Sequence, residues 1–483
     1  MLFNSSIFLI FTSLVFILYW SCFNKNITAR NLFLIIVSYI FYGWWNWRWL
    51  FLIVGCSLIN WLISLELERT QRKRYKQGLL ITACLLSLSA LIVCKYYNFF
   101  VGSFVSACEM LGFHVHIKTL QIILPVGISF FTFQAIGYTI DVYKGKVRAT
   151  RSWIDFFAFI SFFPQLVAGP IERASGFLPQ FRKRYVFDYE KATDGLVLIV
   201  YGLFKKMAVA DNLAIYVDTV FTNFTQYSSL TLLLGAVLFS FQIYCDFSGY
   251  SDIARGIAKL FGFELMVNFD SPYFSKSISE FWRRWHISLS TWFKDYLYIP
   301  LGGNRVSTLK YIRNIWIVFL VSGLWHGANY TFIIWGALHA FYQTCGYFKA
   351  RIQLSANWTM RFSLFRIKPM RYIISGAQIL TVNILVVCAW IFFRADSFEH
   401  AINYFGKMLT WEGYTRLSGL GANYGILFMG VNMFLVCLLI GIDMLSRSVQ
   451  YSQKRKAVFL AGMLLMIIFF GKGGDTAFIY FQF

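Results

Sequence analysis

Apolar segments long enough to cross a lipid bilayer recur along the whole chain of 483 residues. A membrane-spanning helix needs about 20 apolar residues. Candidate segments lie near residues 5–22, 31–46, 49–66, 78–97, 119–140, 153–171, 193–223, 230–260, 311–347, 372–394, 425–446 and 456–471. Only 14% of residues are charged, against about 25% in soluble domains. We therefore expect an all-α polytopic membrane protein with about ten to twelve transmembrane helices, together with re-entrant or interfacial helices.

The apolar segments follow one another without a linker rich in proline, glycine or serine. A single integral membrane domain over residues 1–483 is therefore expected, with N-terminal helices in 1–118, a core in about 119–400 and C-terminal helices in 401–483. The first apolar run, from Ser5 to Tyr19, has no basic region before it and no small-residue cleavage site. It is expected to remain as a membrane span.

Basic residues stand between the apolar segments. The formal net charge is +22, which in a soluble protein would suggest a nucleic-acid partner. Lysine and arginine beside membrane helices instead mark cytoplasmic loops under the positive-inside rule. We therefore expect a protein of the inner (cytoplasmic) membrane whose partner is lipid and not nucleic acid. Its loops at 67–77, 349–371 and 447–456 are expected in the cytoplasm, and its N-terminus outside.

One block, from Glu264 to Arg305, is too charged to face lipid and must line protein or water. Within it, Ser277 and Glu280 form an S-x-x-E capping box that predicts the start of a helix. That helix would carry the string WRRWH. Its mixture of tryptophan, tyrosine and basic residues is typical of an interfacial helix at headgroup depth.

His326 is the histidine that stands out, because it lies in the apolar, helix-forming run VSGLWHGANYTFIIWGALHA. An ionisable side chain at membrane depth is costly and is a functional candidate by default. Helical spacing would place Ser322 and Tyr330 one turn on either side of it. A neutral imidazole can accept a proton near neutral pH. The spacing alone fits equally well a hydrogen-bonded histidine that holds helices together.

Two other polar positions are candidates. His286 ends FWRRWH and is either catalytic or an ordinary interfacial histidine. Asp246 lies in QIYCDFSGYSDIARG, either on a cavity wall or neutralised by a basic partner, as Asp252 would be by Arg255 at i, i+3. The histidines and the nine scattered cysteines lack the spacing of metal ligands, so no metal is expected. No nucleotide-binding or hydrolase motif is present, and no bound cofactor is expected.

Five strings resemble the membrane-bound O-acyltransferase family, in its branch of alginate O-acetylation membrane subunits. They are FFPQLVAGPIER (162–173), QIYCDFSGYSDIARG (242–256), NFDSPYFSKSISEFWRRWHISLSTWFKDYLYIPLGGNR (268–305), SGLWHGANYTFIIWG (322–336) and WIFFRADSF (390–398). The invariant histidine of the family falls on His326, and the second histidine of this branch falls on His286. The resemblance implies a ring of membrane helices around a central tunnel that holds the catalytic histidine.

The resemblance also implies an activity. An acetyl group from a cytoplasmic thioester, acetyl-CoA, would cross the membrane for O-acetylation of an exported, alginate-like polysaccharide, with an extracytoplasmic acetyltransferase as partner protein. His326 would act as general base. Trp325 or Trp285 could stabilise the oxyanion, and Arg283 could hold phosphates of CoA. The alternative is a component that exports polysaccharide or peptidoglycan without chemistry. An internal repeat would favour that alternative, and none is evident in the sequence.

Overall fold

The computed structural model describes residues 1–122, 124–355, 368–410, 425–446, 453–473 and 478–479, and these are almost entirely helical. The first helices are α1 (Ser6–Leu18), α2 (Ile27–Gly43), α3 (Leu50–Arg69), α4 (Lys73–Leu91), α5 (Tyr97–Met110), α6 (Ile128–Tyr143), α7 (Trp153–Ser161), α8 (Phe163–Leu166), α9 (Ala174–Phe177), α10 (Tyr189–Leu203) and α11 (Asp211–Thr222). The remaining helices are α12 (Ser229–Leu260), α13 (Ile278–Arg284), α14 (Ile287–Phe293), α15 (Thr308–His326), α16 (Tyr330–Ser355), α17 (Lys368–Arg394), α18 (Phe398–Leu409), α20 (Gly425–Ser446) and α21 (Gln453–Phe470).

Within the described residues, six helical segments are long and apolar enough to cross a membrane. They are Ser6–Phe23, Trp47–Arg69, Lys73–Met110, Ser229–Leu260, Met370–Arg394 and Phe428–Leu445. Their outer faces carry large exposed apolar side chains such as Leu9, Phe51 and Leu85, which lipid would cover. The expected all-α polytopic membrane fold is therefore confirmed.

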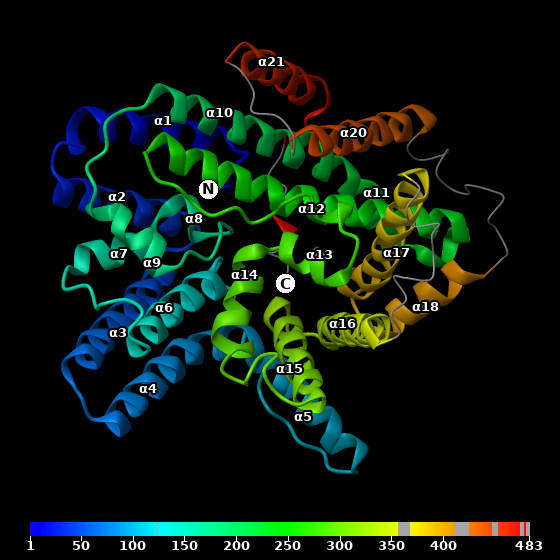
Figure 1. Cartoon of the computed structure of the whole chain (residues 1–483), viewed down its shortest axis with the longest axis horizontal. Coiled ribbons are helices and arrows are strands. Elements are labelled where there is room, and N and C mark those ends of the chain that lie inside the picture. The colour runs from blue at the N-terminus through cyan, green and yellow to red at the C-terminus, as the bar shows by residue number, and fades with distance from the viewer. Residues whose placement is uncertain (123, 356–367, 411–424, 447–452, 474–477, 480–483) are drawn as a thin grey trace.

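The long helices surround a centre in which α13 and α14 lie (Figure 1). Helix α12 crosses the middle of this view, and it packs against α10, α11, α17 and α18. Most of its span is buried, whereas the spans of α1 and α4 are mostly exposed. Helix α12 is thus the inner helix on which the outer ones are assembled.

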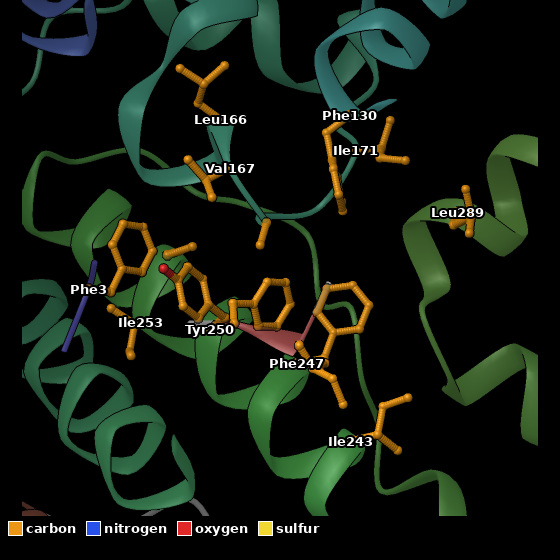
Figure 2. Packing of buried hydrophobic residues seen from close by; sticks show 14 of the residues in the cluster. Phe3, Phe130, Leu166, Val167, Ile171, Ile243, Phe247, Tyr250, Ile253 and Leu289 are labelled. Carbon is orange, nitrogen blue, oxygen red and sulfur yellow. The ribbon is translucent and has the colours of Figure 1, made fainter. Parts of the chain in front are cut away.

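Both ends of the described chain meet α12 in an aromatic cluster. Figure 2 shows Phe3, Tyr250 and Phe247 together on one side of α12. Phe3 stacks on Tyr250 with ring centroids 4.6 Å apart, and the Phe478 ring lies 4.7 Å from that of Tyr250. Because Phe478 and Ile479 are buried there, a segment that follows the last described helix fills part of the centre.

Three expected helices differ from the observed ones. The segment 119–140 becomes helical only at Ile128, because Pro125 and Gly127 precede it and Gly127 has a φ of +74°. The segment 153–171 breaks at Phe162, directly before the short helix with Pro164 in its first turn. The segment 311–347 is two helices, α15 and α16, with a break directly after His326.

Three regions of helix widen into π-helical turns beside lysines. They are η3 (Ile92–Tyr96), η5 (Phe204–Ala210) and η8 (Lys294–Tyr298), and a further π-turn, η1 (Tyr19–Phe23), extends α1. Single π-turns inside helices are frequent at functional sites, because the extra residue redirects the side chains that follow. The segment 193–223, which carries Lys205 and Lys206, is divided into α10 and α11 by the turn η5.

Candidate active site

His326 is the last residue of α15 and is buried. The helix ends there because Gly327 is extended and α16 crosses close by. A Cβ on Gly323 would lie 2.2 Å from the carbonyl oxygen of Phe332, so only glycine permits this approach. Ser322 lies one turn before His326 on α15, as expected. The expectation for Tyr330 was wrong, because it begins α16 and its hydroxyl donates to Ser103 at 2.8 Å.

Aromatic rings enclose the imidazole of His326. The ring centroids of Trp325 and Trp335 both lie 4.9 Å away, and that of Phe393 lies 5.4 Å away, all in edge-to-face arrangements. These contacts come from α15, α16 and α17, so three helices fix the position of one side chain. Water is largely excluded, which strengthens any electrostatic interaction made at this position.

His286 also reaches the centre, by a different backbone route. Helix α13 ends at Arg284, and His286 adopts a left-handed conformation with a φ of +44° before α14 begins. The turn is tied by the backbone N–H of Ile287, which donates to the carbonyl of Asn268 at 2.9 Å. The expected helix therefore begins after Ser277, as the capping box predicted, but it carries only WRR of the string WRRWH. Trp285 and His286 are buried inside the protein, because the chain turns inward between two short helices.

Asn268 determines which nitrogen of His286 is available. The Nδ1 atom of His286 lies 3.2 Å from Oδ1 of Asn268. The same oxygen accepts hydrogen bonds from the backbone N–H and the hydroxyl of Ser288, at 3.2 and 2.9 Å, so it is the amide oxygen and not the nitrogen. Since Oδ1 can only accept, Nδ1 of His286 carries the proton. The Nε2 atom then offers its lone pair, and it is buried without a hydrogen-bond partner among the described residues.

Trp325 contacts both histidines. Its ring centroid is 4.9 Å from that of His326 and 5.9 Å from that of His286. Its indole N–H is buried and meets no acceptor in the described part of the chain. A buried donor without a partner costs free energy, about 1–3 kcal/mol. The N–H can therefore donate a hydrogen bond to an oxygen atom that binds beside it.

Two neighbouring cavities give access to His326. The smaller, of about 40 Å³, is lined by Trp325, His326, Lys95 and the segment 124–130. The larger, of about 420 Å³, is lined by polar groups of Asn329, Arg394 and Asp396 together with Lys95. A volume of this size lies within the range of ligand sites. Lys95 and Leu124 line both cavities, so the two cavities adjoin at these residues.

Lys95 and Tyr96 hold the end of α15. The ammonium group of Lys95 donates to the carbonyl oxygens of Trp325 and His326, at 2.8 and 2.9 Å. The hydroxyl of Tyr96 donates to the carbonyl of Leu324 at 2.9 Å. Both residues come from the turn η3. The sequence reasoning missed Lys95, which reads as a basic residue near the end of a span, and Asn268, which begins the string 268–305.

The other expected site residues lie elsewhere. Arg283 is exposed on α13. Trp285 packs against Phe281 and Trp390, with ring centroids 5.5 and 5.1 Å away. Asp246 accepts a hydrogen bond from the backbone N–H of Ile479 at 2.7 Å and forms an ion pair with a lysine of η5. The structure therefore unites His326, His286 and Trp325, with Ser322 on the adjacent turn, but not Arg283 or Asp246.

The largest described cavity does not contain the histidines. Its volume is about 940 Å³, and it lies between α1, α10, α12 and α21 with mostly apolar lining. No histidine lines it. The chemistry of the molecule is therefore expected at the smaller cavities.

The chain is similar to several known proteins. The model of the MBOAT, membrane-bound O-acyltransferase family, matches residues 146–371. The chain is 40% identical to "Probable alginate O-acetylase AlgI" of Pseudomonas aeruginosa, over 85% of this chain and 76% of that protein. It is 38% identical to "Peptidoglycan O-acetyltransferase" of Helicobacter pylori, over 86% of this chain and 80% of that protein. A "Teichoic acid D-alanyltransferase" of Bacillus subtilis is 29% identical, over 48% of this chain and 61% of that protein.

The matched region contains both histidines and the segment that begins at Asn268. Identity of 40% over most of two chains is far above what chance produces, and the described fold is the polytopic helical one expected. The chain is therefore an acyltransferase and belongs to the membrane-bound O-acyltransferase family.

Proposed function

We propose that this acyltransferase passes acetyl groups from cytoplasmic acetyl-CoA across the inner membrane for O-acetylation of an exported polysaccharide, with His326 as general base. The observation that carries the proposal is the buried imidazole of His326, which ends α15 beside a cavity and next to the unpartnered N–H of Trp325. Base and oxyanion donor are the two groups that acyl transfer to a hydroxyl requires.

In the proposed step, the acceptor hydroxyl attacks the carbonyl carbon of the acetyl thioester while His326 takes the proton of that hydroxyl. The negative charge on the tetrahedral intermediate is stabilised by the N–H of Trp325. The carbon–sulfur bond then breaks, and His326 returns the proton to the sulfur. The products are an acetyl ester and the thiol of CoA.

His286 is proposed to orient the acceptor. Its Nδ1 contacts Asn268, and its ring lies 5.9 Å from that of Trp325. The Nε2 lone pair would accept a hydrogen bond from a different hydroxyl group of the acceptor and so orient the acceptor. His326 remains the proposed base, because it alone of the two lines the cavity that adjoins the larger, polar one.

The acceptor is proposed from the relatives. Their names refer to alginate and to peptidoglycan, which are both extracytoplasmic polymers of sugars. An alginate-like polysaccharide is the proposed acceptor, with a second, extracytoplasmic acetyltransferase supplying glycan specificity. Membership of an acyltransferase family argues against the alternative of an exporter without chemistry.

One reconstitution tests the proposal. The purified chain in liposomes, with acetyl-CoA supplied at its cytoplasmic face, should hydrolyse the thioester slowly and acetylate polymer on the other side only when the second protein is added. His326→Ala should abolish both reactions, because it removes the proposed base. His116→Ala, which changes an exposed histidine in a loop, is the control and should leave both unchanged. Thioester cleavage by His326→Ala at the normal rate would refute the assignment, and acetylation without the second protein would show it to be unnecessary.

A further inference from the structure

Lys95 brings a positive charge into the interior of a membrane-spanning segment. It belongs to the run Lys73–Met110, one of the candidate spans, and is half-buried on the π-turn η3. Charged residues within such segments are costly, and they usually have a carboxylate partner or a functional role. In the described part of the chain, the hydrogen-bond acceptors of Lys95 are backbone carbonyls of α15, and it forms no salt bridge.

Those carbonyls stand at the negative end of a helix dipole. The last four carbonyls of an α-helix have no partner within the helix, and a cation near them is stabilised. Lys95 takes the carbonyls of Trp325 and His326, and Tyr96 takes that of Leu324. One π-turn therefore satisfies three consecutive carbonyls at the end of α15, and the last belongs to the proposed base.

The ammonium group of Lys95 can donate one more hydrogen bond than these contacts use. It carries three N–H donors, and two of them are used by the carbonyls of Trp325 and His326. Lys95 also lines both cavities beside His326. Lys95 therefore lies where the small cavity beside the imidazole of His326 adjoins the larger, polar cavity.

From this arrangement we infer that Lys95 is a positioning residue for acyl transfer, which holds the end of α15 so that His326 faces the cavity and keeps a positive charge beside the developing oxyanion. The inference rests on the proposed role of His326. It assigns a function to a residue outside the region matched by the family model. Lys95 acts through α15 and through its field, and not as a base.

The test compares three variants of the full-length chain. Lys95→Met removes the charge and both hydrogen bonds. Lys95→Arg keeps a cation that can donate to the same carbonyls. Tyr96→Phe is the matched control, because it removes one hydrogen bond to the same helix end from the same π-turn but no charge. Each variant is purified in nanodiscs, and kcat and KM for cleavage of acetyl-CoA are measured beside those of the wild type and of His326→Ala.

We expect Lys95→Met to lower kcat about 10- to 100-fold, as loss of a residue that orients a catalytic ligand does, with KM within about twofold. Lys95→Arg should recover most of the lost kcat, and Tyr96→Phe should stay within about threefold of the wild type. Equal losses in Lys95→Met and Tyr96→Phe, or a normal kcat in Lys95→Met, would overturn the inference. A normal rate in His326→Ala would instead refute the proposed function, so the two failures are distinguishable.

Discussion

At the scale of single residues, the two histidines reach the centre with their orientation set by residues from other parts of the chain. His326 ends a helix whose carbonyls are held by Lys95, 231 residues earlier. His286 occupies a left-handed turn, and its ring is held by Asn268, 18 residues earlier. In both cases the partner fixes what the imidazole can do. The chemistry of the site therefore depends on side chains that carry no reaction themselves.

Asn268 offers a direct test of this dependence. Asn268→Asp keeps an oxygen that accepts from Nδ1 of His286, so His286 should retain the same tautomer and the variant should keep most of its activity. Asn268→Leu has a similar size but no acceptor, and it should lower acetylation about 10- to 100-fold. The measurement is the acetyl content of the exported polymer in cells that carry each variant, normalised to the amount of protein in the membrane.

Ser288→Ala is the control for Asn268. It removes a different donor to the same oxygen, together with the 3.5 Å contact between the Ser288 hydroxyl and Nδ1 of His286, and leaves the shorter contact between Asn268 and His286 in place. Its activity should stay near that of the wild type. If Asn268→Leu and Ser288→Ala were equally impaired, the role of Asn268 would be to hold the local fold and not to orient His286.

At the scale of elements, the π-turn η5 brings two adjacent lysines against α12. Lys205 pairs with Asp252 at 2.8 Å, and Asp252 also pairs with Arg255, as the i, i+3 spacing predicted. Lys206 pairs with Asp246 at 2.6 Å and with Asp211 at 2.9 Å. Lys206 and both of its partners are buried. The pair with Lys206 explains the buried carboxylate of Asp246 without a role in catalysis.

Removing Lys206 should destabilise the assembly of α10, α11 and α12. In Lys206→Met, two buried carboxylates would face each other without a cation, and breaking a buried ion pair costs about 3–5 kcal/mol. Lys191→Met is the control, because Lys191 pairs with Glu264 on the surface, where such pairs contribute at most about 1 kcal/mol. The free energy of unfolding of both variants is measured in mixed micelles. Equal values for the two variants would contradict the structural role of Lys206.

The sequence predicted the helical class, the membrane location and the two histidines, because these depend on local apolar runs and on short motifs. It did not predict the break after His326, because that break depends on the extended Gly327 and on the close crossing of α16 at Gly323, and the local sequence does not record this crossing. Lys95 and the pairing of Asp246 with Lys206 were also missed. Such contacts join residues far apart in the chain, and no periodicity records them.

At the scale of the whole molecule, the orientation in the membrane stays a prediction. The expected cytoplasmic loops at 349–371 and 447–456 lie partly outside the described residues, whereas the loop at 67–77 is described in full. The helical run from Lys73 to Met110 has 38 residues. At about 1.5 Å per residue this run exceeds the roughly 30 Å thickness of the hydrocarbon core, so we expect the residues before and after it on opposite sides of the membrane.

Labelling of single cysteines tests this orientation. In a background without the nine native cysteines, Arg72→Cys should react with an impermeant maleimide only after spheroplasts are lysed, because the basic loop lies in the cytoplasm. His116→Cys, beyond the other end of the run, should react in intact spheroplasts. Labelling in the reverse order would show that the N-terminus faces the cytoplasm.

The contact between Ile479 and Asp246 has a consequence for biosynthesis. The two residues are separated by 233 positions, and a ribosome adds about 5–20 residues per second. The segment that contacts α12 is therefore synthesised roughly 10–50 s after the contacted part of α12. During that interval Asp246 lacks the hydrogen bond from Ile479, so this contact can form only after α12 has been made.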